Sequence, residues 1–506
     1  MPKPSVAIGA PVDERTALLP EGNTPASGPN LAQDEQWQKH TLGRRSFILI
    51  TSLTIFLAVE LGGSLATIPL LQIQEGIVCR QHHANVTEPA IDPRCKDSVV
   101  QADFAMLQGW ESTFGLIPGL LLSVPYGIAS DKHGRRVVLF LSLLGIALLQ
   151  SAVTVISYFP AVFPIRLIWA SAFLTVIGGG PFVMNAVICT ICSDVSTSEQ
   201  RSNTFFLIAA TAIAGQLIGN PLTYVAMNYD VWFATFLGVG ILYLATFAST
   251  AVPETLDTVE TMERASLNED TDPDCEHSSS IEKLTQRFKA ATFELLNAFR
   301  LLATNARLCF LLGSFVFTTL GKTASAMLLQ YVTKKFQWTW AEASLLLSVK
   351  ATISIVLFVA VFPMVNQLLL NVAALPAIVK DMWLSRGSIL CLVVGTFGLG
   401  LAPTSANMIL ALTVYSLGSG YGATIRSLLT ATVSPNHTGM LYSLMSLLEN
   451  TGALVAGPLL AVTFRIGMGW GGVWVGLPFI AAGFMFSIAM VVVFSIQPRH
   501  LTAAAA

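Results

Sequence analysis

The chain has 506 residues, of which 53% are hydrophobic and only 11% are charged, and its net charge is -2. A soluble domain carries about 25% charged residues, so the composition excludes a soluble globular protein. The charge balance also excludes the basic surface of a nucleic-acid-binding protein. We therefore expect an integral membrane protein.

Residues 1–44 precede the first apolar run and are rich in proline and small or polar residues. We expect a disordered cytoplasmic tail. No cleavable signal peptide is recognisable in it, so we expect the first span to act as the insertion signal. Within the tail, the stretch from Glu14 to Leu19 resembles an acidic dileucine sorting signal. We expect a multi-pass protein of the plasma membrane, and this motif keeps a vacuolar or endosomal membrane as the alternative.

A helix needs about 20 mostly apolar residues to cross the hydrocarbon core. Twelve such runs follow the tail, near 46–71, 104–129, 137–157, 162–192, 204–227, 230–252, 308–330, 342–363, 387–403, 406–432, 440–464 and 471–495. We assign 364–386 to the lower end of span eight and a cytoplasmic connection. Lys and Arg concentrate in the loops that are cytoplasmic when the N-terminus is inside, so both termini are expected in the cytoplasm.

The sequence thus predicts an all-α membrane protein with twelve transmembrane helices in two six-helix pseudo-repeats. The expected bundles are 45–252 and 307–496, followed by a cytoplasmic tail over 497–506. Between them, 253–306 is a cytoplasmic linker. Its second part has apolar residues at helical spacing, which fits an amphipathic helix on the inner leaflet or an ordinary solvated helix.

The loop after the first span is expected to lie outside the membrane. It contains the sequon Asn85-Val86-Thr87, so we expect glycosylation at Asn85; a chance sequon is the alternative. Cys79 and Cys95 flank it and either form a disulfide or remain free thiols. With seven cysteines in the whole chain, no disulfide framework is expected to hold the fold.

The most specific motif lies between spans two and three. It reads Gly127-Ile128-Ala129-Ser130-Asp131-Lys132-His133-Gly134-Arg135-Arg136 and resembles the signature loop of the major facilitator superfamily. The resemblance implies a cytoplasmic latch in which the Asp caps a helix and pairs with cations. The residues it implicates are Gly127, Asp131, Gly134, Arg135 and Arg136, with Asp194, Glu199 and Arg201 as partners at the end of span four.

Within that family, the text around Glu75–Arg80, Lys334–Trp338 and Ser446–Pro458 resembles fungal members related to the proton-coupled folate and haem-carrier branch. Fungal members of this kind are often exporters. Span five matches the glycine–proline pattern of antiporters only in part, because Asn220 separates Gly219 from Pro221. That departure weakens the case for export.

Charged residues inside spans are expensive and usually functional. The set comprises Glu60, Glu111, Arg166, Lys322, Lys350, Arg426 and Glu449. Four of them, Glu60, Arg166, Lys322 and Arg426, fall on spans one, four, seven and ten, which line the central cavity in this family. From their depth we expect an outer cluster of Glu111, Arg166 and Lys350, and an inner Arg426–Glu449 pair.

A carboxylate that changes its cationic partner between two conformations can bind and release a proton. Glu60 is the first candidate for this role and Glu449 the second; for each, a permanent structural ion pair is the alternative. The excess of cations suggests an anionic substrate. We expect a monomeric, proton-coupled carrier that exports a small organic molecule, with no cofactor, no metal and no catalytic residues. The alternatives are proton-coupled uptake and a nutrient-sensing receptor that does not transport.

Overall fold

The computed structural model describes residues 31–196, 201–255, 306–369, 376–431 and 438–495. Contacts divide the chain into a short unit, Met1–Ser46, and a large one, Phe47–Ala506; the description below concerns the large unit. The residues of the expected sorting signal, of most of the linker, and of the C-terminal tail lie outside the described residues.

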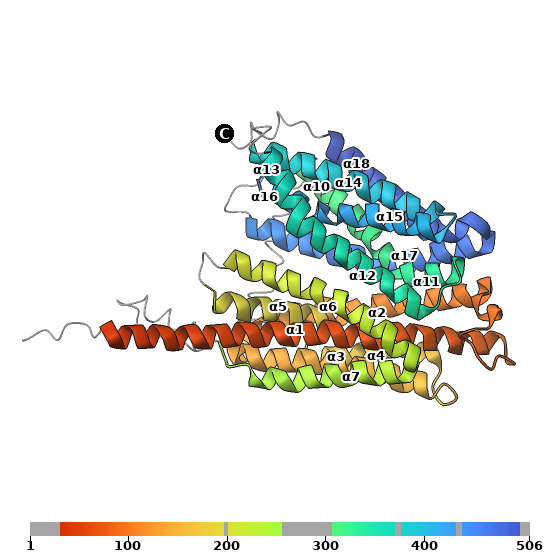
Figure 1. Ribbon diagram of the computed structural model, residues 1–506, viewed down its shortest axis with the longest axis horizontal. Coiled ribbons are helices and arrows are strands. Elements are labelled where there is room, and N and C mark those ends of the chain that lie inside the picture. The colour runs from red at the N-terminus through yellow and green to blue at the C-terminus, as the bar shows by residue number, and fades with distance from the viewer. Residues whose placement is uncertain (1–30, 197–200, 256–305, 370–375, 432–437, 496–506) are drawn as a thin grey trace, which may run out of the picture. The chain divides into compact units, whose positions relative to one another are not determined.

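All regular structure in the described residues is helical (Figure 1). The N-terminal half contains α1 (Leu31–His82), α2 (Ser98–His133), α3 (Arg135–Tyr158), α4 (Ile168–Ser171), α5 (Gly180–Asp194), α6 (Arg201–Tyr229) and α7 (Val231–Ala248). The C-terminal half contains α10 (Ala306–Thr323), α11 (Leu328–Lys335), α12 (Trp340–Val356), α13 (Phe362–Gln367), α14 (Ala377–Leu401), α15 (Ser405–Leu417), α16 (Tyr421–Ala431), α17 (Thr438–Trp470) and α18 (Leu477–Ser495).

Twelve helical segments are long and apolar enough to cross a membrane, which confirms the predicted number of spans. Several spans combine two helices: α10 and α11 are joined by η5 (Ala324–Met327), and α15 and α16 by η8 (Gly418–Gly420). The predicted boundary of span nine was wrong, because this span begins at Val379 and not near residue 387. Near its start, the Lys380 ammonium lies 3.1 Å from the Asp381 carboxylate, which also accepts from the Ser427 hydroxyl of α16 over 2.6 Å.

The helix starts follow from local capping. Asp230 begins α7 by accepting bonds from the backbone N–H groups of Trp232 and Phe233. Thr339 and Glu342 form a capping box at the start of α12. Each cap satisfies backbone N–H groups that have no partner within the helix. These caps fix where spans six and eight begin.

Span four is a broken helix. It begins at Ile165 and runs through η2 (Ile165–Leu167), α4 and η3 (Ala172–Val176), and is interrupted before α5. Gly178 and Gly179 have φ of 85° and 76° there, a region that glycine tolerates best. The Tyr126 hydroxyl donates to the Val176 carbonyl over 2.9 Å and accepts from the Gly178 N–H over 2.8 Å. Tyr126 therefore satisfies backbone groups that a break at membrane depth would leave unpaired.

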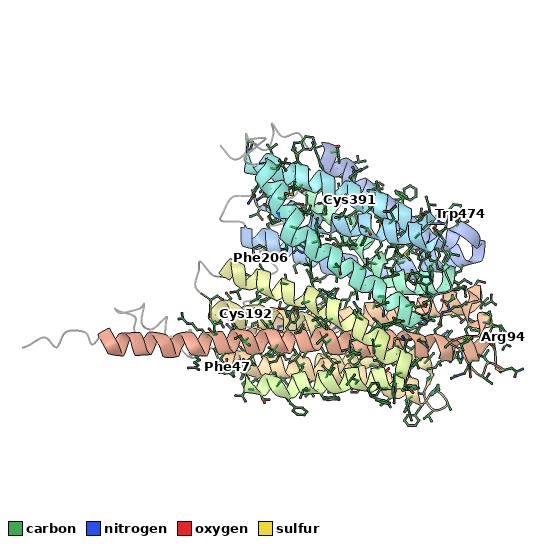
Figure 2. The ribbon with its side chains drawn as sticks, in the orientation of Figure 1. Phe47, Arg94, Cys192, Phe206, Cys391 and Trp474 are labelled. Carbon is green, nitrogen blue, oxygen red and sulfur yellow. A yellow bond between two sulfur atoms is a disulfide. The ribbon has the colours of Figure 1, made fainter. Side chains whose placement is uncertain are left out.

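Large apolar side chains cover the outside of the helices. Phe206 and Trp474, labelled in Figure 2, are 71% and 48% exposed. Such exposure of large apolar side chains suits a protein whose surrounding solvent is lipid. Arg94 projects from the loop beyond the ends of α1 and α2 (Figure 2). We call this end exterior and the opposite end cytoplasmic, following the orientation predicted from the cations.

A disulfide joins Cys79, near the end of α1, to Cys95 in η1 (Pro93–Lys96), with 5.0 Å between their Cα atoms. It closes the exterior loop over the ends of α1 and α2. Asn85 is exposed in that loop, where an oligosaccharide could be attached; its glycosylation remains a prediction.

Candidate functional site

A cavity of about 470 Å³ lies between the two halves. Its lining comes from α1, α2, α10, η5, α11, α12 and α17, so both halves contribute. Gln108, Ser112, Thr323 and Gln330 supply polar groups to a wall that is otherwise mainly apolar. A pocket of this kind, apolar with a few placed polar groups, is typical of a site for a small organic molecule.

Hydrogen bonds close the exterior side of this cavity. The Trp340 indole donates to the Glu75 carboxylate over 2.7 Å, and Gln330 donates to the Gln101 carbonyl over 2.9 Å. All four of these residues are at most 5% exposed. Because Glu75 and Gln101 belong to one half and Gln330 and Trp340 to the other, the halves are joined at this end.

Glu60 lies on the face of α1 that lines the cavity, since it precedes the lining residue Thr67 by seven positions, about two helical turns. It is partly buried and lies beside Gln216 of α6. Among the described residues, no cation forms an ion pair with it. The structure thus gives Glu60 an amide neighbour in place of the ion pair that was the alternative reading.

The C-terminal half brings four of the predicted charges together. Arg426 donates to Glu449 over 2.7 Å, and this is the predicted inner pair. Lys322 lies within electrostatic range of Glu449, Arg426 and Lys350. The Lys350 ammonium is 3.4 Å from the Ser325 hydroxyl. Lys322 thus lies near two further cations and one carboxylate, so this part of the C-terminal half carries an excess of positive charge.

The predicted outer cluster does not form. Arg166 lies in span four, as predicted, but at its exterior end, where it is exposed in η2 just after Pro164. One carboxylate oxygen of Glu111 is buried without a hydrogen-bond partner. In the part of the chain that the structure describes, no ion pair joins Glu111, Arg166 and Lys350.

The residues expected to form the cytoplasmic latch cluster around Arg135, whose guanidinium contacts Asp131 and lies 3.3 Å from the Asp194 carboxylate. The helix cap differs from the one implied by the resemblance. Glu254, and not Asp131, accepts from the backbone N–H groups of Arg135 and Arg136, over 2.8 and 3.2 Å. A carboxylate suits this position because the helix N-terminus carries partial positive charge.

The other latch residues have different surroundings. Gly134 has φ of 100° between α2 and α3, and a side chain there would meet the Glu254 carboxylate. Gly127 has open space around it, so packing does not require glycine at that position. Glu199 lies outside the described residues, as does the side chain of Arg201.

Glu75, Gln101, Gln330 and Trp340 were missed as site residues. The predicted first span ended at residue 71, which put Glu75 in the exterior loop, whereas α1 continues to His82. The available signal was the spacing: Glu75 precedes Cys79 by four residues and therefore shares its helix face. A disulfide at Cys79 implies that this face is directed at the protein.

The two halves approach most closely where α2 meets α17. A methyl group on Gly457 would lie 2.6 Å from the Gly109 carbonyl oxygen and 3.0 Å from the Thr113 hydroxyl. The same hydroxyl donates across the interface to the Leu454 carbonyl over 3.1 Å. Small residues allow this backbone contact.

Replacement of Gly457 by alanine is therefore expected to push α2 and α17 apart and to lower the stability of the protein by about 1–3 kcal/mol. The measurement is thermal unfolding of the purified protein. Gly115→Ala on α2 is the matched control, since nothing lies within 4 Å of the added methyl group; it should be neutral or slightly stabilising. Equal behaviour of the two variants would contradict the close approach.

Comparisons with known proteins agree with this geometry. A family model described as Major Facilitator Superfamily matches residues 98–457. The MFS efflux pump atnC of Emericella nidulans is 31% identical over 87% of this chain and 86% of its own length. The efflux pump ustT of Aspergillus flavus is 28% identical over 96% and 92%. The folate and haem-carrier resemblance is not supported by these relatives.

Solved structures share the fold. A D-xylose–proton symporter has a TM-score of 0.60 at 15% identity, covering 89% of this chain and 98% of its own. A bacterial homologue of the iron transporter ferroportin has a TM-score of 0.58 at 14% identity, covering 90% and 98%. With twelve spans, a cavity between two halves, and a family model that matches most of its length, the chain belongs to the major facilitator superfamily.

Proposed function

We propose that this chain is a proton-coupled exporter of a small organic molecule that works by alternating access. The observation that carries the proposal is the cavity between the halves, closed on its exterior side by hydrogen bonds. In contrast to these buried exterior residues, the Arg426 and Glu449 side chains, which lie nearer the cytoplasmic end, are 46% and 37% exposed. Export is favoured by the relatives named efflux pumps. We place the protein in the plasma membrane.

The charge balance supports an anionic substrate. Lys322 lies within electrostatic range of two cations, Lys350 and Arg426, and of a single carboxylate, Glu449. Buried charge of one sign is costly unless it is neutralised. A carboxylate on the substrate would supply the missing negative charge, while the mainly apolar wall of the cavity would hold its carbon skeleton.

The test is reconstitution in liposomes with an imposed pH gradient and a dye that reports proton flux. Three probes separate the substrate classes: an aromatic carboxylate, its neutral methyl ester, and a hydrophobic cationic dye. We expect proton movement with the carboxylate and much less with the other two. The sign of the coupling distinguishes export from uptake. Binding of a probe to folded protein without any flux would overturn the proposal in favour of a receptor.

The neutral ester is the informative control for the charge argument. If ester and acid were transported equally, coupled transport would stand but the anionic substrate would be excluded. Lys322→Gln in the same assay should reduce transport of the acid and leave any transport of the ester unchanged, because only the acid carries a negative charge.

A further inference from the structure

Glu75 is a buried carboxylate at the exterior end that the proton and substrate pathway described above does not use. It is 2% exposed, and both of its oxygens accept hydrogen bonds. The Lys96 ammonium lies 2.7 and 2.8 Å from its two oxygens. The Gln101 amide and the Trp340 indole also donate to it. Such a carboxylate is stable when buried only because its partners replace water.

These hydrogen bonds between the halves all run in the same direction. The N-terminal half supplies the acceptors, which are the Glu75 carboxylate, the Gln101 carbonyl and side-chain oxygens, and the Lys96 carbonyl. On the C-terminal side stand donors: Trp340, Gln330 and Lys334. Opening the exterior end would break all of these bonds together. The two sides of the contact are thus complementary in hydrogen-bonding polarity.

The disulfide fixes the N-terminal side of this contact. Cys79 lies one turn beyond Glu75 on α1, and Cys95 directly precedes Lys96. The Cys95 carbonyl also accepts from the Gln101 amide over 2.9 Å. The disulfide therefore holds Lys96 and Gln101 against Glu75 even before the C-terminal half makes its contacts with them. Preorganisation of this kind lowers the entropy that must be lost when the contact forms.

We propose that Glu75, Lys96, Gln101, Gln330 and Trp340 form an exterior latch that holds the exterior-closed state, and that the Cys79–Cys95 disulfide positions it. The proposal rests on the alternating access proposed above. It assigns the closing of the exterior end to these five side chains, which lie at the opposite end of the molecule from the cytoplasmic latch. Glu75 and Trp340 act here as positioning residues for the transport cycle.

The test uses a cysteine that the latch should protect. Ser112 is exposed to the cavity on α2, eleven residues further in than Gln101. The parent for labelling carries Ser112→Cys and serine at the five cysteines outside the disulfide, which are Cys189, Cys192, Cys275, Cys309 and Cys391. A membrane-impermeant maleimide is added to sealed cells, and the labelling rate measures how often the exterior end opens.

Trp340→Phe keeps an aromatic ring next to Phe104, 5.9 Å away, and Lys96, 5.6 Å away, but removes the indole N–H. We expect labelling to accelerate roughly tenfold, the factor that one hydrogen bond to a charged group can supply. Trp232→Phe is the matched control, because Trp232 packs at the same end among Tyr158 and Phe236 of its own half. Its labelling rate should equal that of the parent.

Two further variants keep the test decisive. Gln330→Leu removes the donor to Gln101 and should also accelerate labelling if Trp340→Phe fails to fold. Joint replacement of Cys79 and Cys95 by serine should accelerate it to a smaller extent, since Glu75 and Lys96 remain. Unchanged labelling in folded Trp340→Phe and Gln330→Leu would overturn the latch. Because the assay needs no substrate, faster labelling in a chain that failed the flux assay would leave the latch standing and remove the proposed function.

Discussion

Replacement of Arg135 by alanine is expected to cost about 3–5 kcal/mol of stability, the penalty for removing one partner of a buried ion pair. The Arg135 side chain is 11% exposed and pairs with Asp194, which is 13% exposed. The only other side-chain donor to Asp194 among the described residues is the Thr255 hydroxyl, at 3.2 Å. Without Arg135 a nearly buried carboxylate would lose its cation. Thermal unfolding of the purified protein measures the loss.

Two neighbours provide controls for this prediction. Arg136 is exposed and contributes only its backbone N–H to Glu254, so Arg136→Ala should be nearly neutral. Asp131 is 58% exposed, and exposed ion pairs contribute about 0–1 kcal/mol. Asp131→Asn should therefore leave stability almost intact. If Arg136→Ala lost as much stability as Arg135→Ala, net charge and not the Asp194 pair would explain the effect.

The same contrast separates stability from turnover at the cytoplasmic end. Asp131 contacts Arg135 but is largely exposed, so its pair can break at little cost when the helices move. Asp194 accepts hydrogen bonds from Arg135 and from Thr255. Thr255 directly follows Glu254, the residue that caps α3. A fixed pair beside an exchangeable one is what a latch requires, because one end must stay anchored while the other releases.

Much of the fold could be predicted because the membrane imposes simple rules. Every spanning helix must be apolar over its length, and the sequence shows this directly. The Arg426–Glu449 pair was predictable as well, since charges of opposite sign at similar depth in adjacent spans stabilise one another. The signature loop pointed to the contacts of Arg135 with Asp131 and Asp194, while their role as a latch stays a prediction. Each of these inferences used information that is local in the sequence.

The parts that were missed depend on where helices end and on what faces them. Span one continues past its apolar run because Glu75 is paired with Lys96 and accepts a hydrogen bond from Trp340. Trp340 is more than 260 positions away in the sequence, and no local pattern shows such a partner. Arg166 was placed too deep because the apolar run around it continues through Pro164, where the helix has not yet begun. Glu254 became the cap of α3 by tertiary packing alone.

The second large effect is expected at Glu60. Glu60→Gln keeps the shape of the side chain and its position beside Gln216, but it can no longer bind or release a proton. In the Ser112→Cys parent, each labelling rate is divided by the rate of the unfolded parent at the same pH, which removes the pH dependence of thiol ionisation. We expect this corrected rate to change roughly tenfold with pH, which corresponds to about 1.4 kcal/mol of differential stabilisation between the two conformations. Glu60→Gln should abolish that dependence, as measured by maleimide labelling across a series of external pH values.

Two other carboxylates must be excluded by the same assay. Glu449 already accepts a hydrogen bond from Arg426 over 2.7 Å, so Glu449→Gln should preserve the pH dependence. Glu111 has one oxygen buried without a partner, so Glu111→Gln tests whether that group, and not Glu60, binds the proton. A flat pH profile for either variant, together with a normal profile for Glu60→Gln, would remove Glu60 from the proton path. Glu60 is favoured because it lies on the cavity face of α1 beside an amide of α6, where movement of one half against the other can change its neighbours between one conformation and the next.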